Sequence, residues 1–393
     1  MMKAFRFRIY PTKDQKILLH KTFGCVRKVW NHFLAECEDA YRNKQPRPNA
    51  TKMQKELTQL KQELPYLYEV DNTALQRCLR YLDQSYQRFF KIQKMGPKFT
   101  DKKLKWLAKH PDHTITNFDL NGHPQWKCKK NPQRSYTAVK INNNIEVNCT
   151  HIKLPKIGWV RYRDQRISVE GKILNATVTQ EASGKYYVSI CCDNVEPQFI
   201  PLAGKMIGID LGIKEFLITS DGLKIKNHRF FKKKLQKLRR LQRSLSRKTK
   251  DGKNWEKNRQ KLAIQYEKVR HARLDFHHQL TTYLVKEYDI ICVETLKIKN
   301  MIKNHKLAQA ISDVAWGQFI QLLEYKMIWA KKILVKIDTF FPSSQICSCC
   351  GYQNTDTKNL LVRKWTCPQC NTHHDRDINA AKNILNEGLK QIA

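Results

Sequence analysis

The stretch KMIGIDLGIKEFLITSDG, residues 205–222, decides the fold of this chain. It opens with an apolar run containing Met206, Ile207 and Ile209, and the run stops at Asp210. A charged carboxylate at the end of a buried strand is costly unless something binds it. The stretch therefore predicts a buried strand that presents Asp210 to a ligand.

Two more acids hold comparable positions. Glu294 closes the apolar run DIICVE, and Asp377 opens the last helix in HHDRDINAAKNIL. Singly, the three acids have ordinary interpretations, namely a turn residue for Asp210, a lysine partner for Glu294 and a helix cap for Asp377. Together, two strand ends and a facing helix can bring three carboxylates to one site, which favours hard cations such as Mg²⁺. Two such ions about 3.5–4 Å apart can clamp the oxygens of a phosphodiester.

A second metal site is predicted near the C-terminus. Two CxxC pairs are separated by sixteen residues, a spacing typical of a zinc ribbon. The four ligands are Cys347, Cys350, Cys367 and Cys370. Four thiolates complete a tetrahedron, so we expect one structural Zn²⁺ with no open position. Cys349 is expected to be a bystander, and His373 and His374 are competing ligands that four cysteines make unnecessary.

The charge of the chain indicates a polyanionic partner. Its 73 Lys and Arg against 35 Asp and Glu give a formal charge of +38, which favours nucleic acid over an anionic membrane. We find no apolar run near the roughly 18 residues of a membrane helix, and the N-terminus lacks the apolar block of a signal peptide. We therefore expect a cytoplasmic or nucleoid protein without membrane association, whose 13 cysteines are thiols or metal ligands rather than disulfides.

The basic residues concentrate in one segment. Between Lys224 and Arg273 there are twenty Lys and Arg against three acids, so the face repels itself unless a polyanion neutralises it. The residues expected to contact a nucleic-acid backbone are Lys232, Lys233, Lys234, Lys237, Arg239, Arg240, Arg243 and Arg247. Arg376 beside Asp377 could also touch a phosphate, with a solvated arginine as the alternative.

Hydrophobic periodicity divides the chain into three parts. Apolar and polar side chains alternate over residues 1–10, which predicts a strand, and Thr12 is expected to be a helix N-cap. Residues 14–94 carry apolar side chains at helical spacing. Residues 136–194 read as short strands, with a hairpin around Ser183 and Gly184. The remainder alternates strands with helices at 235–245, 255–286 and 311–331, and it ends in a helix. Residues 101–135 are polar and irregular, and their pattern assigns no fold; Cys128 in this stretch is read as an ordinary thiol.

The motifs GIDLGIKEFLITSDG, ICVETL, the paired CxxC and HDRDINAAKNIL resemble the TnpB proteins of bacterial insertion sequences and the related RuvC-type CRISPR effectors. The opening RFRIYPTKDQKILLHKTFGCVRKVWN and the middle IKLPKIGWVR are also similar, so the resemblance runs nearly end to end.

This resemblance implies an α/β RNase H-like (RuvC) nuclease domain with an inserted zinc ribbon, a β-barrel wedge domain and a helical recognition domain. The implied bounds are 1–12 and 113–200 for the wedge, 13–112 for recognition, and 201–393 for the nuclease with a basic helical segment at 228–288 and the ribbon at 343–372. No motif-reading residues are transferred onto residues 101–135, which are longer and more irregular than the family leads us to expect.

The resemblance also implies function. The three acids of the family match Asp210, Glu294 and Asp377 and would coordinate two Mg²⁺ ions, which Mn²⁺ can replace, with Asp210 bridging both. The implied activity is RNA-guided cutting of double-stranded DNA beside a short motif, directed by a guide RNA from the transposon end. The oligomeric state stays open.

Two alternatives remain. Relatives that have lost their acids suggest a catalytically silent, RNA-guided DNA-binding repressor. The GIDLG turn also resembles the phosphate loop of actin-like ATPases and sugar kinases, but Ile213, Lys214, Glu215 and Phe216 follow it instead of small hydroxyl residues.

Overall fold

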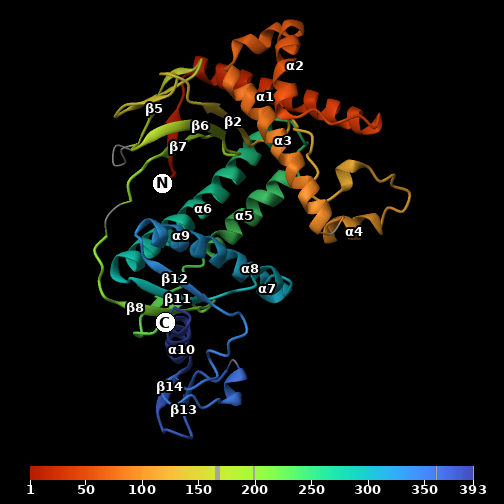
Figure 1. Ribbon diagram of the computed structural model, residues 1–393. Helices are drawn as coiled ribbons and strands as arrows, with labels where there is room; N and C mark the ends of the chain where they lie inside the picture. Colours follow the sequence, from red (N-terminus) through yellow and green to blue (C-terminus); the bar gives the residue numbers. More distant parts are fainter. Residues whose placement is uncertain (97, 164–168, 198–199, 360, 393) are drawn as a thin grey trace. The chain divides into compact units, whose positions relative to one another are not determined.

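The computed structural model describes residues 1–96, 98–163, 169–197, 200–359 and 361–392. The chain forms two compact units, Met1–Glu196 and Pro197–Ala393 (Figure 1). The predicted wedge and ribbon ranges include residues 164–168, 198–199 and 360, which lie outside the described residues.

The first unit combines helices with an antiparallel sheet. Its helices are α1 (Lys13–Arg42), α2 (Ala50–Glu63), η1 (Pro65–Glu69), α3 (Asn72–Met95), α4 (Asp101–Leu107) and η2 (Asn117–Asp119). Its strands are β1 (Lys3–Tyr10), β2 (Arg134–Val139), β3 (Glu146–Val147), β4 (His151–Leu154), β5 (Gly158–Tyr162), β6 (Lys172–Gln180) and β7 (Tyr186–Asp193). The predicted opening strand, the helical stripes and the hairpin around Gly184, with φ of 82°, are confirmed. Thr12 caps α1 in a box with Gln15.

The strands of this unit form a seven-stranded sheet in the order β2-β6-β7-β1-β5-β4-β3. Among the described residues no pairing joins β2 to β3, so the expected closure into a barrel is not observed. The helices and the sheet share one hydrophobic core, in which Phe7 of β1 belongs with Phe33 of α1 and Leu79 of α3. The helices therefore cover apolar sheet surface that a closed barrel would bury within itself.

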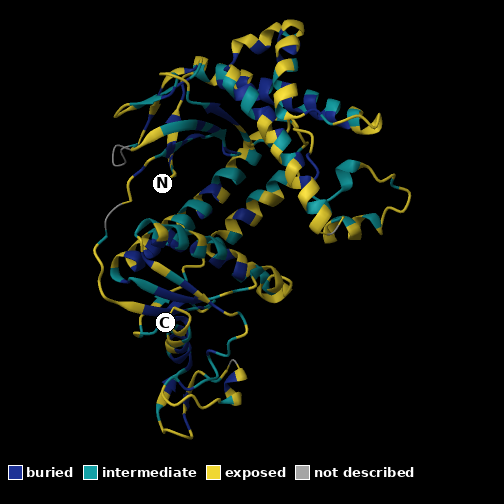
Figure 2. Cartoon of the chain, viewed as in Figure 1, coloured by how far each residue is buried: buried dark blue, intermediate teal, exposed yellow. Residues whose placement is uncertain are grey.

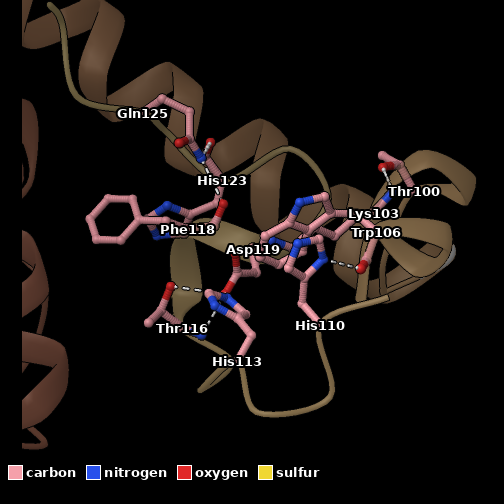
Figure 3. A network of polar contacts seen from close by, with 10 residues as sticks. All are labelled: Thr100, Lys103, Trp106, His110, His113, Thr116, Phe118, Asp119, His123 and Gln125. Atoms are coloured by element: carbon pink, nitrogen blue, oxygen red, sulfur yellow. Dashed lines mark hydrogen bonds and ion pairs between the residues drawn. The ribbon is translucent and has the colours of Figure 1, made fainter. Parts of the chain in front are cut away.

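The segment that the sequence pattern leaves unassigned is held by a polar network (Figure 3). Asp119 accepts hydrogen bonds from the Thr116 amide at 2.8 Å and from His113 at 3.0 Å, and it pairs with Lys103 of α4. The Lys103 ammonium and the Thr116 amide hold the pKa of Asp119 well below its usual range. His110 stacks on Trp106 with ring centroids 4.2 Å apart. Local polar contacts, rather than an apolar stripe, thus order this segment, which explains why hydrophobic periodicity is uninformative there.

The second unit is an α/β layer structure. Its strands are β8 (Met206–Leu211), β9 (Glu215–Thr219), β10 (Lys224–Lys226), β11 (Ile290–Glu294), β12 (Ile333–Ile337), β13 (Lys364–Thr366) and β14 (His373–Asp375). Its helices are α5 (Phe230–Ser246), α6 (Lys253–Glu287), α7 (Ile298–Met301), α8 (His305–Val314), α9 (Trp316–Trp329), η3 (Thr355–Lys358) and α10 (Arg376–Lys390). The main sheet has the order β10-β9-β8-β11-β12, with β8, β11 and β12 parallel and β9 antiparallel to its neighbours.

One predicted helix of this unit is wrong. Residues 311–331 were expected to form a single helix, but the chain breaks at Ala315, which adopts a left-handed conformation with φ of 54°. Trp316 directly after the break is 2% exposed. The turn at Ala315 therefore places a large side chain in the core that a continuous helix would direct elsewhere.

The two faces of the main sheet carry different layers. Ile207 and Ile209 of β8 join α6 and α9 in one core cluster, whereas Cys292 of β11 packs with Ile384 of α10 on the other face. Figure 1 shows α10 on the opposite side of the sheet from α9. Because side chains alternate along a strand, Gly208 and Asp210 share one face of β8, opposite to Ile207 and Ile209.

Glycines let α10 approach the sheet closely. A Cβ atom on Gly208 would lie 2.0 Å from the Ala381 carbonyl oxygen and 2.7 Å from the Leu385 amide nitrogen. A Cβ on Gly388 of α10 would lie 2.3 Å from the Cys292 sulfur. Gly208 therefore allows backbone contact between β8 and α10, and Gly388 leaves room for the Cys292 side chain.

We predict that Gly208→Ala destabilises the second unit by about 1–3 kcal/mol, because the added methyl group must push α10 off β8. The measurement is urea unfolding followed by a probe in this unit. Gly24→Ala in α1 is the control, since no atom lies within 4 Å of a Cβ there and its φ is not positive. An unchanged unfolding midpoint for Gly208→Ala would contradict the close approach.

Candidate nuclease site

Two of the predicted acids lie side by side at one edge of the sheet. Strands β8 and β11 are parallel, and Ile209 pairs with Val293 in their register. The next residues, Asp210 and Glu294, therefore continue that register at the carboxyl ends of both strands. Both acids are half-buried, and alternation places both on the face covered by α10.

The third acid comes from the start of that helix. Asp377 is the second residue of α10, whose N-cap Asp375 accepts hydrogen bonds from the Asp377 amide at 3.1 Å and the Ile378 amide at 3.2 Å. Lys224 of β10 pairs with Asp375 at 2.6 Å. The start of α10 is thus fixed both by its contact with β8 and by an ion pair to the sheet.

Electrostatics shows that the three acids share one neighbourhood. Burial, followed by the negative charges of Glu294 and Asp377, raises the pKa of Asp210 to about 7, against the opposing effect of the Arg376 guanidinium. Burial also raises the pKa of Glu294. Carboxylates under mutual repulsion gain stability from a bound cation.

The donor set fits a hard divalent cation. Three carboxylates without nitrogen or sulfur donors are the ligands that Mg²⁺ and Mn²⁺ accept. Their oxygen atoms are not among the described groups whose ligand atoms all lie within 4.8 Å of one another. The three carboxylates therefore do not form a compact cluster with all ligand atoms within 4.8 Å of one another, and Arg363 contacts Asp377 at 3.4 Å.

The four predicted zinc ligands form one cluster. Cys347, Cys350, Cys367 and Cys370 lie within 4.8 Å of one another, with sulfur–sulfur distances of 3.6 Å for Cys347–Cys370 and 3.5 Å for Cys350–Cys367. A tetrahedral ion with 2.3 Å bonds to sulfur requires about 3.8 Å. The site therefore fits Zn²⁺ and leaves no position for water.

Each zinc knuckle closes through a residue with positive φ. Gly351 donates to the Cys347 carbonyl at 3.0 Å, and Asn371 donates to the Cys367 carbonyl at 2.9 Å, with φ of 82° and 56°. In the first knuckle, Gly351 supplies the left-handed turn. In the second knuckle, Asn371 supplies the left-handed turn.

The ribbon is attached to α10 by side chains that the sequence analysis missed. Asn379 donates to the Ile346 carbonyl at 2.6 Å and accepts from the Ser348 amide at 2.9 Å, and Asn383 donates to Ser343 and Ile346. Both asparagines are buried. Their spacing of four residues puts them on one helix face. Two asparagines within an otherwise apolar stripe of the last helix were the sequence pattern from which this attachment could have been predicted.

His374 contacts the zinc cluster from outside. Its Nε2 lies 3.1 Å from the Cys347 sulfur, and with Cys349 and Cys347 it forms a second group of ligand atoms within 4.8 Å. This group offers three ligands and shares Cys347, so the four cysteines remain the better match for zinc. Cys349 is exposed, as is Cys128, which belongs to neither of these groups.

The predicted phosphate-contacting residues lie along α5 and its C-cap, and all eight from Lys232 to Arg247 are exposed (Figure 2). Asp313 of α8 caps this helix by accepting from the Phe231 and Lys232 amides at 2.8 and 3.1 Å. Five of the eight basic residues line a shallow groove along the helix. The segment presents positive charge outward, as its sequence indicates.

Arg376 differs from that group. Its side chain is 7% exposed and donates to the Asn359 carbonyl at 3.2 Å. The alternative of a solvated arginine is therefore wrong, because the guanidinium turns inward and its charge acts on Asp210.

Comparisons with known proteins bear on this site. Residues 189–305 match a family described as "Probable transposase" of the IS605 OrfB type, residues 316–384 match the Cas12f1-like TNB domain, and residues 1–46 match a helix-turn-helix domain of the same OrfB type. No helix within the described ranges has the length and apolar character to cross a membrane.

Curated relatives match over the full chain. A Streptomyces pristinaespiralis protein, named as an inferred RNA-guided DNA endonuclease, is 34% identical over 100% of this chain and 90% of its own length. InsQ of Escherichia coli K12, named in the same way, is 28% identical over 100% of this chain and 94% of its own length. Among solved structures, Cas12f1 in complex with sgRNA and target DNA shares the fold, with a TM-score of 0.52, 14% identity, and coverage of 98% of this chain and 99% of that one.

We predict that Cys347→Ser and Cys367→Ser each reduce bound zinc from about one ion per chain to well below one, because three thiolates no longer close the tetrahedron. Elemental analysis of the purified chain measures this. Cys349→Ser is the matched control and should keep its zinc. Zinc loss on Cys349→Ser but not on Cys370→Ser would favour the group with His374.

We also predict that Asp210→Asn raises the melting temperature in magnesium-free buffer by a few degrees at pH 8. Because the folded pKa of about 7 exceeds the ordinary value of 3.8, ionised Asp210 destabilises the folded state increasingly between pH 4 and pH 7, and fully above. The gain should shrink toward zero near pH 4. Calorimetry measures it, with the exposed Asp356→Asn as control, and a pH-independent difference would refute the assignment.

Proposed function

Because the chain belongs to the TnpB (IS605 OrfB) family, we propose that it is an RNA-guided DNA endonuclease of a transposable element that hydrolyses DNA next to a short target-adjacent motif. The observation that carries this proposal is the meeting of Asp210, Glu294 and Asp377 at one sheet edge, where burial and like charge raise the pKa of Asp210. Relatives named for this activity match the chain from end to end.

In this proposal the second unit is a RuvC-like, RNase H-like nuclease domain with a zinc ribbon inserted before α10. The mixed five-stranded sheet with its central β8 supports it, as does the match to the TNB domain. The sheet of the first unit would be the wedge and its helices the recognition part. The Cas12f1 complex, which holds sgRNA and target DNA, has the same fold.

Asp210, Glu294 and Asp377 would hold Mg²⁺ or Mn²⁺. Such ions would supply positive charge to the scissile phosphate and would lower the pKa of the attacking water. The chain's own contribution is to place three carboxylates on one face through β8, β11 and α10. Burial of the site limits water around the acids and strengthens their interaction with cations.

The exposed basic residues of α5 would hold the backbones of guide RNA and target DNA. A guide transcribed from the transposon end would select the target DNA sequence by base pairing, while the protein would recognise only the adjacent motif.

The test uses the full chain purified with its co-expressed transposon-end RNA. We predict cutting of matched double-stranded DNA in Mg²⁺ or Mn²⁺, and a loss of more than about a hundredfold in rate for Asp210→Ala. Target binding, measured by gel shift, should stay within about threefold, because the guide and the basic surface carry it. Asp338→Ala is the control, since Asp338 also follows a parallel strand but is exposed.

Two outcomes would overturn parts of this proposal. If the intact complex binds the target yet never cuts with either metal, the repressor alternative is correct. If Asp210→Ala cuts at the wild-type rate, the acids have been assigned wrongly.

A further inference from the structure

A pocket of about 370 Å³ opens beside the turn that follows Asp210. Ile213, Asn227, Arg229, Lys232, Lys306 and Asp313 are among its lining residues. Ile213 lies three residues beyond Asp210, so its Cα is within about 11 Å of the acid along the chain. Asn227 holds the turn by donating to the Ile213 carbonyl at 2.7 Å.

The pocket carries excess positive charge. Arg229, Lys232 and Lys306 are exposed, and none of them forms an ion pair with an acid in the part of the chain that the structure describes. Asp313 is the acid of the lining, so three cations against one acid leave a net charge of +2. An anion entering this pocket would meet cations that have no competing partner.

The Asp313 carboxylate already has partners within the protein. Its two oxygens accept the Phe231 and Lys232 amides, and Arg273 lies close enough to interact with its charge. The capped helix amides are therefore occupied, and the side chains of Arg229, Lys232 and Lys306 must carry any recognition of an anion.

The backbone of Arg229 has a strained conformation that hydrogen bonds hold in place. It adopts φ of 50° and ψ of 52°, a conformation that non-glycine residues rarely keep without support. Its amide donates to the Asn227 side chain at 3.0 Å, and its carbonyl accepts from Lys233 at 3.0 Å. Arg229 is thus held at the mouth of the pocket.

We propose that this pocket binds a backbone phosphate of the DNA strand being cut, one that flanks the phosphate at Asp210, and so positions that strand. The inference rests on the proposed nuclease function and extends it to a specific substrate contact. One side of the pocket is the turn at Ile213, which follows the carboxyl end of β8, and open α/β sheets bind their ligands at the carboxyl ends of their strands. Because Ile213 of its lining follows Asp210 by only three residues, we assign the pocket to the cut strand rather than to the guide RNA.

The first experiment scans the target strand with single methylphosphonate linkages, which remove one phosphate charge at a time. In the wild-type complex, one flanking position should slow single-turnover cutting by about tenfold, the effect of losing a charge-assisted contact. Lys232→Gln/Lys306→Gln should slow cutting of unmodified DNA similarly and be insensitive to that same linkage. This double variant leaves the strained Arg229 untouched.

The matched control is Lys226→Gln/Lys303→Gln, two exposed lysines of the neighbouring segments that do not line the pocket. It should keep both the wild-type rate and the wild-type sensitivity to the flanking linkage. If the pocket variant and the modified linkage together slow cutting by the product of their separate effects, the two do not act on one contact and the proposal is overturned.

The second experiment does not depend on cutting. Amine-reactive labelling of the full chain with its RNA, read by mass spectrometry, should show Lys306 protected about threefold or more by matched target DNA, with Lys226 and Lys303 unchanged. Protection by the RNA alone would overturn assignment to the DNA strand. Protection without any cutting would retain the pocket and refute the nuclease, whereas cutting without protection would refute the pocket.

Discussion

The contact between α10 and β8 at Gly208 is the constraint on which the second unit depends. A single Cβ there would overlap the Ala381 carbonyl, so the helix lies on the strand at a distance set by backbone atoms. Strand alternation then directs Asp210 toward the helix, the parallel register brings Glu294 beside it, and the helix start supplies Asp377. Burial, followed by the charges of Glu294 and Asp377, raises the pKa of Asp210 at this position. A buried site with three acids is costly, and the neighbouring backbone contact is what holds it together.

The zinc ribbon belongs to the same arrangement. The segment that carries its first knuckle is hydrogen-bonded to the buried Asn379 and Asn383 of α10. Arg363, between the cysteine pairs, forms an ion pair with Asp377. A ribbon that small has little core of its own, with Trp365 packed beside Cys347 and Cys367, so a bound metal ion would supply much of its stability. A zinc ion bound there would act on the acid site indirectly, by fixing the segment that leads into α10.

Features that depend on local pattern could be predicted from the sequence. The run ending at Asp210, the paired CxxC and the cap at Thr12 each follow from residues close together in the chain. Features decided by distant contacts could not. The break at Ala315 follows from burial of Trp316, the inward turn of Arg376 from the neighbouring ribbon, and the open sheet of the first unit from helices that share its core. The acid triad lies between these cases, because three local signals suggested it and only the α10 contact brings its members together.

The central claim is that Asp210, Glu294 and Asp377 form one cation site rather than three separate acids. Titration of the zinc-loaded chain with Mn²⁺, followed by electron paramagnetic resonance, tests this most directly. One shared site should bind about two ions per chain and should lose binding when any one of the three acids becomes alanine. Unchanged Mn²⁺ binding in Asp377→Ala would contradict it, because the helix would then contribute nothing to the site.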